Sequence, residues 1–185
     1  MGRHTLRLVV CVALAAGTAF AQPREELIER TLAIVGGRAV TLADVRTAMA
    51  LGLLPDSPDL DRATEKLVER ALVLSEVERY APSEPEEPAI EEGLAEIRAR
   101  RSESEIVAAL TGGGFTEARL RAWIRDDLRI ASYLDQRFAA AADLPVEQAA
   151  PQLRERLAAE RRANLIADWI TDLKRRTPVV ELWKR

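Results

Sequence analysis

The segment that most constrains the fold runs from Leu67 to Val77, because it is apolar around most of a helical circumference. At about 100° per residue, its apolar side chains cover well over half of a helix surface; they are Leu67, Val68, Ala71, Leu72, Val73, Leu74 and Val77. Only a strip that contains Glu69 and Glu76 stays clearly polar. A helix of this kind is buried among other helices, so the sequence predicts a bundle built around residues 60–80.

Capping residues and glycines divide the rest of the chain into further helices. Thr41 followed by Asp44, and Ser102 followed by Glu105, have the spacing of a capping box, which marks the start of a helix. The predicted helices span about 41–52, 60–80, 87–101, 102–111, 117–138 and 150–176. Ala, Leu, Glu and Arg, which favour helices, are abundant, so we expect a mainly α fold of about six helices.

Short β-prone segments lie near both ends of the predicted domain. Residues 31–35 and 38–40 flank Gly36-Gly37, a pair that favours a tight hairpin turn. Residues 178–183 have the pattern of a terminal strand. A strand needs partners for its backbone groups, so we expect this strand and the hairpin to form a small antiparallel sheet that joins the two ends.

Residues 1–21 have the pattern of a cleaved secretory signal. A basic start is followed by an apolar run from Leu8 to about Ala16 and by an Ala-x-Ala ending at Ala21. The apolar run is shorter than the roughly 20 residues that a membrane-spanning helix needs. We therefore expect cleavage after Ala21 and an exported single domain, residues 22–185, without a membrane span.

The predicted signal contains the only cysteine and the only histidine, Cys11 and His4. A mature chain without them cannot build a Ser-His-Asp or Cys-His site, and zinc or copper sites are not expected. Removal of Arg3 and Arg7 leaves 25 basic and 30 acidic side chains, a net charge of −5. This sign is opposite to that of most nucleic-acid-binding proteins. We expect no catalytic residues, no metal, no cofactor and no nucleic-acid partner.

Three charged clusters are interpreted mainly as solvated surface. The clusters are the acidic run Glu86, Glu87, Glu91 and Glu92, the pair Asp126-Asp127, and the stripe Arg121, Arg125 and Arg129. The acidic run is flanked by prolines, whereas acid/base work needs carboxylates held in a pocket with separated pKa values. The arginine stripe could meet phosphates or acidic clients, although acidic neighbours dilute its charge.

Taken together, the order of elements resembles that of the SurA-type periplasmic chaperones. Residues 31–45 resemble the opening pattern of that family, I-x-A-V-V-N-x-x-x-I-T-x-S-E-L, and residues 67–80 resemble its L-I-x-x-x-L-L-x-Q-x-A-x-x-x-x-I helix. Residues 113–138 match a later helix more loosely. The family usually carries parvulin-type prolyl isomerase domains before the last helix. Here only residues 139–146 occupy that place, between the amino-terminal part 22–138 and the carboxyl-terminal part 147–185.

The resemblance implies an ATP-independent periplasmic holdase for unfolded exported or outer-membrane polypeptides, without an isomerase domain. Such a protein needs exposed apolar surface, and our candidates are Met49, Leu53, Leu54 and Trp123. Each of the four could instead belong to the core, to which Trp169 and Trp183 are assigned. An adaptor that docks one folded partner and a degenerate prolyl isomerase remain alternatives. A homodimer that exchanges the last helix is compatible with the sequence.

Overall fold

The computed structural model describes residues 30–142 and 151–184, and these form a mainly helical fold with one small sheet. The predicted signal and the linker residues 143–146 lie outside the described residues. Along the chain the elements are β1 (Thr31–Val35), β2 (Arg38–Thr41), α1 (Leu42–Leu51), α2 (Leu60–Tyr80), α3 (Glu87–Arg100), α4 (Glu103–Gly112), α5 (Glu117–Arg137), the 3-10 turn η1 (Ala139–Ala142), α6 (Pro151–Arg176) and β3 (Val179–Glu181). The predicted fold class is confirmed.

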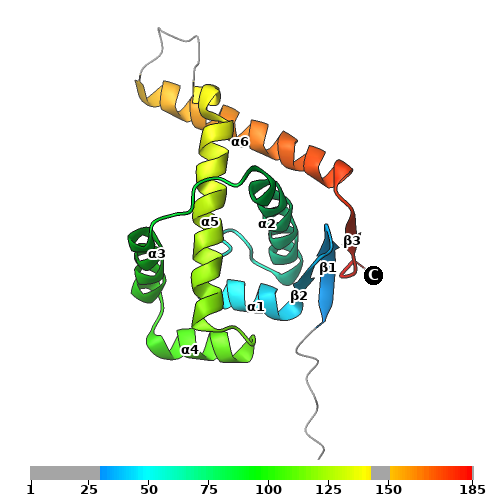
Figure 1. Cartoon of the computed structure of the whole chain (residues 1–185), viewed down its shortest axis with the longest axis vertical. Helices are drawn as coiled ribbons and strands as arrows, with labels where there is room; N and C mark the ends of the chain where they lie inside the picture. The colour runs from blue at the N-terminus through cyan, green and yellow to red at the C-terminus, as the bar shows by residue number, and fades with distance from the viewer. Residues whose placement is uncertain (1–29, 143–150, 185) are drawn as a thin grey trace, which may run out of the picture.

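The three strands form one antiparallel sheet in the order β2-β1-β3, so the two ends of the domain meet as predicted (Figure 1). β1 and β2 are joined by Gly36 and Gly37, whose φ angles of 55° and 88° require glycine-like freedom. The terminal strand is shorter than predicted at both ends: it begins after Pro178, which has no N–H to donate, and it ends at Glu181, before Leu182 and Trp183. The carbonyl oxygen of Pro178 accepts a hydrogen bond from the Gly36 N–H at 3.0 Å.

Both predicted capping boxes are present. The Thr41 hydroxyl accepts from the Asp44 N–H at 3.1 Å, and the Asp44 carboxylate accepts from the Thr41 N–H at 2.9 Å. Ser102 and Glu105 make the same reciprocal pair at the start of α4. Each box satisfies backbone donors that the first turn of a helix leaves free. These local signals explain why the sequence predicts these two helix starts so closely.

Helix α2 lies at the centre of the molecule, between the sheet and α5, as its apolar surface predicts (Figure 1). Leu72 is fully buried in this core. The strip with Glu69 and Glu76, however, is covered by α6. The buried carboxylate of Glu76 pairs with Arg176 of α6 at 3.3 Å, and Glu69 pairs with Lys174 at 3.0 Å. The polar strip predicted on α2 therefore packs against α6 through ion pairs.

A second, smaller apolar cluster joins α3 and α4 to α5. Its buried members are Leu51, Ile90, Leu94, Ile97, Ile106, Leu120 and Ile124. The helices approach closely where α3 has Gly93, because a Cβ there would lie only 2.6 Å from Cγ2 of Ile124. The two clusters share Leu53 and Leu110 at their margins. The long helix α5 therefore spans both clusters and holds them together.

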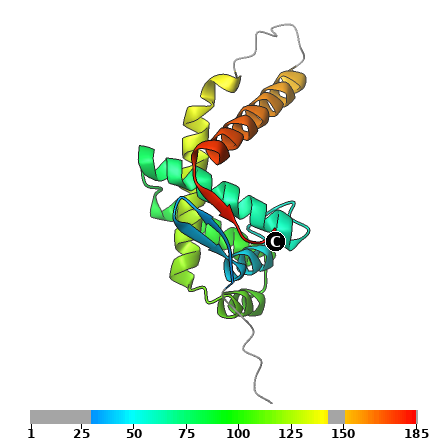
Figure 2. The same ribbon diagram turned by 90° about the vertical axis from the view of Figure 1, so that its right-hand side faces the viewer.

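The two halves of α6 have different surroundings. Its carboxyl-terminal half packs on the core through Trp169, whose ring lies 5.9 Å from Tyr133 and 5.8 Å from Phe138 between centroids. Its amino-terminal half projects from the body of the molecule (Figure 2). We refer to this half, residues 151–165, as the arm. Leu153, Leu157 and Leu165 on the arm are exposed by 49%, 36% and 38%, so the apolar residues of this helix form no continuous buried stripe.

Deletion of residues 178–185 should lower the free energy of unfolding by about 1–2 kcal/mol. The deletion removes β3 and the half-buried side chains of Val179 and Trp183, which pack against the core. A thermal melt of residues 22–185 measures the effect, which should be a fall of several degrees in the midpoint. An unchanged midpoint would show that β3 contributes nothing to the closed sheet.

Candidate functional site

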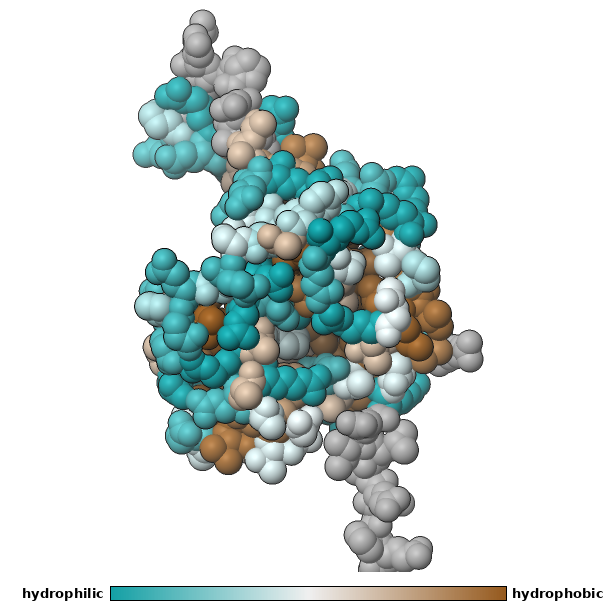
Figure 3. All heavy atoms as spheres, viewed as in Figure 1, coloured by the Kyte–Doolittle hydropathy of each residue, from teal (hydrophilic) through white to brown (hydrophobic). Residues whose placement is uncertain are grey.

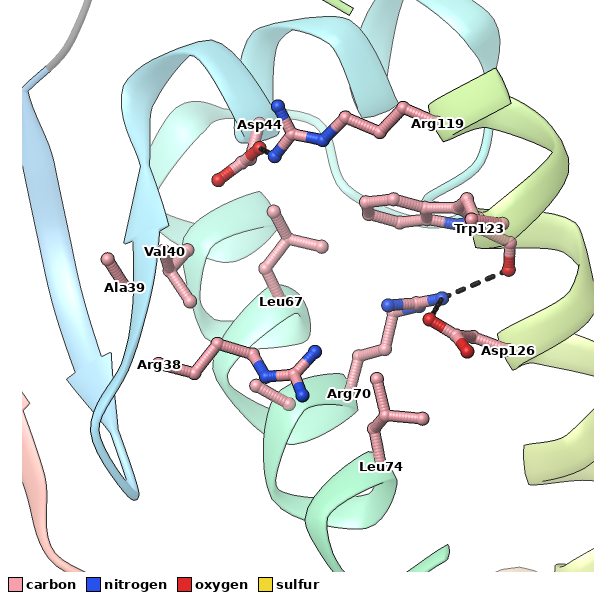
Figure 4. Close-up of a pocket in the computed structure, with 12 residues that line it drawn as sticks. Arg38, Ala39, Val40, Asp44, Leu67, Arg70, Leu74, Arg119, Trp123 and Asp126 are labelled. Carbon is pink, nitrogen blue, oxygen red and sulfur yellow. Dashed lines mark hydrogen bonds and ion pairs between the residues drawn. The ribbon is translucent and has the colours of Figure 1, made fainter. Parts of the chain in front are cut away.

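A pocket with a volume of about 240 Å³ lies between the sheet and helix α5 (Figure 4). Residues of β2, α1, α2 and α5 line it: Arg38, Ala39, Val40, Asp44, Leu67, Arg70, Ala71, Leu74, Arg119, Ala122, Trp123 and Asp126. We call it the Arg70 pocket. Helix α2 contributes the apolar residues Leu67 and Leu74, and β2 forms one wall. An apolar base with a few converging polar groups is typical of a binding site.

Arg70 ties α2 to α5 at this pocket. Its Nε donates to Asp127 at 2.7 Å, and its Nη2 donates to the Trp123 carbonyl oxygen at 3.1 Å. Asp126 lies 3.9 Å from the same guanidinium group, which also stacks 3.9 Å above the centre of the Trp123 ring. One partly buried arginine therefore satisfies two carboxylates, one carbonyl and one aromatic face. Sequence reasoning missed this residue, because no local signal tells which distant carboxylate an arginine will meet.

Two further ion pairs lie at the edges of the pocket. Arg119 of α5 pairs with Asp44 of α1 at 2.5 Å, and Arg38 of β2 pairs with Glu78 of α2 at 2.6 Å. With Arg70, each of the three lining arginines has a carboxylate partner. The pocket therefore presents little unbalanced charge, which favours neither a free anion nor a free cation.

Burial raises the pKa of both Asp126 and Asp127 above the ordinary value of 3.8, although the Arg70 charge acts in the opposite direction. The carboxyl groups of Asp126 and Asp127 both lie beside the guanidinium group of Arg70. Through this guanidinium group the two carboxyl groups of α5 are held to α2, so the arrangement links the two helices.

The four predicted site residues all belong to or pack against the larger core cluster, and only Trp123 lines the Arg70 pocket. Trp123 is only 9% exposed and forms a wall of the Arg70 pocket, so the expectation that it lies on an exposed flank is wrong. Met49, Leu53 and Leu54 lie at the end of α1 and in the following turn, half-buried against the core. They do not line the Arg70 pocket. Trp169 and Trp183 contact the core as expected, Trp169 buried and Trp183 half-buried.

Two of the three charged clusters are less exposed than their sequence interpretation: the aspartate pair, and the arginine stripe, in which the side chains of Arg121 and Arg129 are only 26% and 15% exposed. Asp126 and Asp127 are partly buried and share Arg70, so the prediction that they are plain surface residues is wrong. The acidic run and the arginine stripe neutralise each other in part, because Arg121 pairs with both Glu87 and Glu91. Among residues 30–142 and 151–184, no cluster of His, Cys, Asp and Glu side chains could hold a metal ion.

The exposed apolar side chains are scattered over a largely hydrophilic surface (Figure 3). In Figure 3 they form brown areas over α4 and over the side of the sheet. In the part of the chain that the structure describes, the large exposed hydrophobic residues are Ile34, Leu60, Tyr80, Val107, Leu153, Leu157, Leu165 and Val180. Three of these eight lie on the arm, which is the highest share for any single element and makes the arm a second candidate surface.

Comparison with protein-family models gives no match for this chain, and comparison with curated proteins gives none. Within the described residues, no helix is both long enough and apolar enough to cross a membrane. The fold and the two candidate surfaces are thus the structural basis on which a function can be proposed.

Proposed function

We propose that the protein is an ATP-independent holdase of the periplasm, which binds unfolded exported or outer-membrane polypeptides. The observation that carries the proposal is the arm: a helical segment that projects from the body and exposes Leu153, Leu157 and Leu165. Exposed apolar side chains on a projecting element are typical of an interaction surface.

The arm combines these leucines with charged side chains that keep it soluble. Every residue from 151 to 157 is exposed, and Arg154, Glu155 and Arg156 lie between the leucines. Arg156 also pairs with Glu160 at 3.0 Å along the same helix. Such a surface binds through apolar contact without a fixed pattern of hydrogen bonds, which suits many unrelated unfolded chains. The sequence resemblance to SurA-type chaperones and the signal-like start support the same function and location.

Suppression of aggregation tests the proposal. The mature chain, residues 22–185, is mixed without nucleotide with a chemically unfolded outer-membrane protein, and light scattering is followed. We expect suppression near a stoichiometric ratio, and we expect Leu153→Ser with Leu157→Ser to weaken it several-fold. Both leucines are exposed, so the variant should keep its melting temperature.

The matched control replaces two exposed apolar residues away from the arm, Leu60→Ser with Val107→Ser. It should suppress aggregation like the wild type. Leu53→Ser with Leu54→Ser tests the surface predicted at the end of α1, with circular dichroism to confirm folding. Equal loss in the arm variant and the control would rule out the arm as the client surface.

Failure of the wild-type chain to suppress aggregation at any ratio would contradict the holdase. Tight binding to a single folded envelope protein would then favour the adaptor. Acceleration of cis-trans exchange in an X-Pro peptide would favour a degenerate isomerase. Sedimentation of the mature chain decides whether it also forms a homodimer.

A further inference from the structure

Within the described residues, strand β2 has an unpaired edge beside the Arg70 pocket. In the sheet order β2-β1-β3, β1 pairs on both sides, whereas no strand of the described chain pairs with the outer side of β2. Figure 4 shows β2 between β1 and the pocket, so this edge borders the cavity. An unpaired strand edge is a ready template for another extended chain.

The register identifies which backbone groups point to this edge. The two-residue turn makes Val35 and Arg38 a hydrogen-bonded pair, and such pairs alternate with pairs that exchange no hydrogen bond. Ala39, which lies opposite Ile34, is in a pair of the second kind. Its N–H and C=O therefore point away from β1, toward the outer edge of β2.

The other side of β1 follows the same alternation. The Leu182 N–H donates to the Leu32 carbonyl at 2.7 Å, and Gly36 donates to Pro178 at 3.0 Å. Even-numbered residues of β1 thus bond to β3, and its odd-numbered residues bond to β2. By the same rule, Glu181 of β3 directs its N–H and C=O to the opposite, outer edge of the sheet.

The Arg70 pocket suits a side chain of a strand added beside β2. Its volume of about 240 Å³ exceeds the roughly 150 Å³ that accommodates a benzene ring. Leu67, Leu74 and Trp123 give it apolar walls, so one large apolar side chain fits. The paired arginines leave no free charge to select an anion. The site can therefore bind a ligand through backbone hydrogen bonds to β2 and through one apolar side chain in the pocket.

We infer that the outer edge of β2 binds an extended segment of an unfolded polypeptide by strand addition, with one apolar side chain of that segment in the Arg70 pocket. In this mode, main-chain hydrogen bonds supply affinity and the pocket selects the side chain. The inference rests on the proposed holdase function and assigns it a second, more selective site than the arm. It favours segments with alternating apolar and polar residues, because alternate side chains of a strand face the same side.

Ala39→Pro tests the inference at its central group. Proline removes the outward N–H, and the hydrogen-bonded pairs between β1 and β2 do not use that group. The probe is a fluorescein-labelled decapeptide of alternating Leu and Ser with a terminal Lys at each end, followed by fluorescence anisotropy. We expect Ala39→Pro to raise the dissociation constant about tenfold or more. Saturating peptide should also slow hydrogen exchange of the Ala39 amide in the wild type.

Glu181→Pro is the matched control, because it removes an outward N–H from the other edge of the same sheet. It should change the dissociation constant by less than about twofold.

Ala122→Leu fills the pocket from α5 and leaves the strand edge unchanged. It should raise the dissociation constant of the peptide as Ala39→Pro does. A peptide with methylated backbone nitrogens at alternate residues should not bind. Equal affinity of Ala39→Pro and Glu181→Pro for the probe, with both folded, would overturn the inference.

The aggregation assay separates failure of this site from failure of the function. If the wild-type chain suppresses aggregation but does not bind the peptide, the proposed β2 site is wrong and the holdase function stands. If it does neither, both proposals are wrong. A concentration-dependent dimer abolished by Ala39→Pro and unaffected by the peptide would show that a second copy occupies the edge, which also overturns the inference.

Discussion

Leu72→Ala should lower the free energy of unfolding by about 2–5 kcal/mol, among the largest single-residue effects in this chain. Leu72 is fully buried on α2, the helix that both the sheet and α6 cover. Truncation removes apolar contacts and leaves a cavity that close-packed neighbours fill only in part. Urea denaturation of residues 22–185 measures the change.

Leu60→Ala is the control for this prediction, because Leu60 begins the same helix but is 39% exposed. Its cost should stay below about 1 kcal/mol. A loss below about 1 kcal/mol for Leu72→Ala would contradict a central position for α2.

Arg70→Met should lower the free energy of unfolding by about 2–3 kcal/mol near neutral pH. Methionine keeps an apolar stem beside Trp123 but removes the guanidinium group from Asp126, Asp127 and the Trp123 carbonyl. The value lies below that of a fully buried ion pair, because the two carboxylates are only partly buried. Urea denaturation at several pH values is the measurement.

The pH dependence distinguishes loss of this charge network from loss of packing. Burial already raises the folded-state pKa of Asp126 and Asp127 above 3.8, and loss of Arg70 raises it further. A raised folded-state pKa means that the folded chain binds the proton more tightly, so the stability from these groups falls as pH rises through that window. The deficit of Arg70→Met should therefore be largest above the raised pKa and shrink as pH falls through it.

Asp126→Asn with Asp127→Asn provides the control. In the Arg70→Met background these substitutions remove the unpaired charges, so they should recover part of the stability at neutral pH and little at acid pH. A deficit of Arg70→Met that stays constant with pH would show that the arginine acts through packing alone.

Much of the fold follows from local features of the sequence. The helix starts at Thr41 and Ser102 depend on side chains within one turn, and the hairpin depends on two adjacent glycines. The burial of α2 follows from the apolar side chains that cover most of its circumference. That the ends of the domain share a sheet follows from the need of a terminal strand for a partner.

The candidate site was less predictable, because its geometry depends on contacts between distant segments. Arg70 pairs with Asp127 and Glu76 pairs with Arg176, and the sequence around these residues predicts neither ion pair. Trp123 lies next to the core positions of α5, and only the packing of Phe115 and Arg70 against its ring determines that it is buried. The exposure of the arm was equally hidden, since leucines at helical spacing usually indicate a covered face.

The central position of β1 has a consequence for how the chain folds. Val35 near the start of the domain pairs with Val179 near its end, so the sheet closes only after nearly the whole domain is present. Contacts of such large sequence separation require the closure of a long loop, which slows folding. A chain that emerges from its amino terminus can build helices α1 to α5 early, but β1 keeps one edge unpaired until β3 is present. Completion of the sheet should therefore wait for residues 179–181.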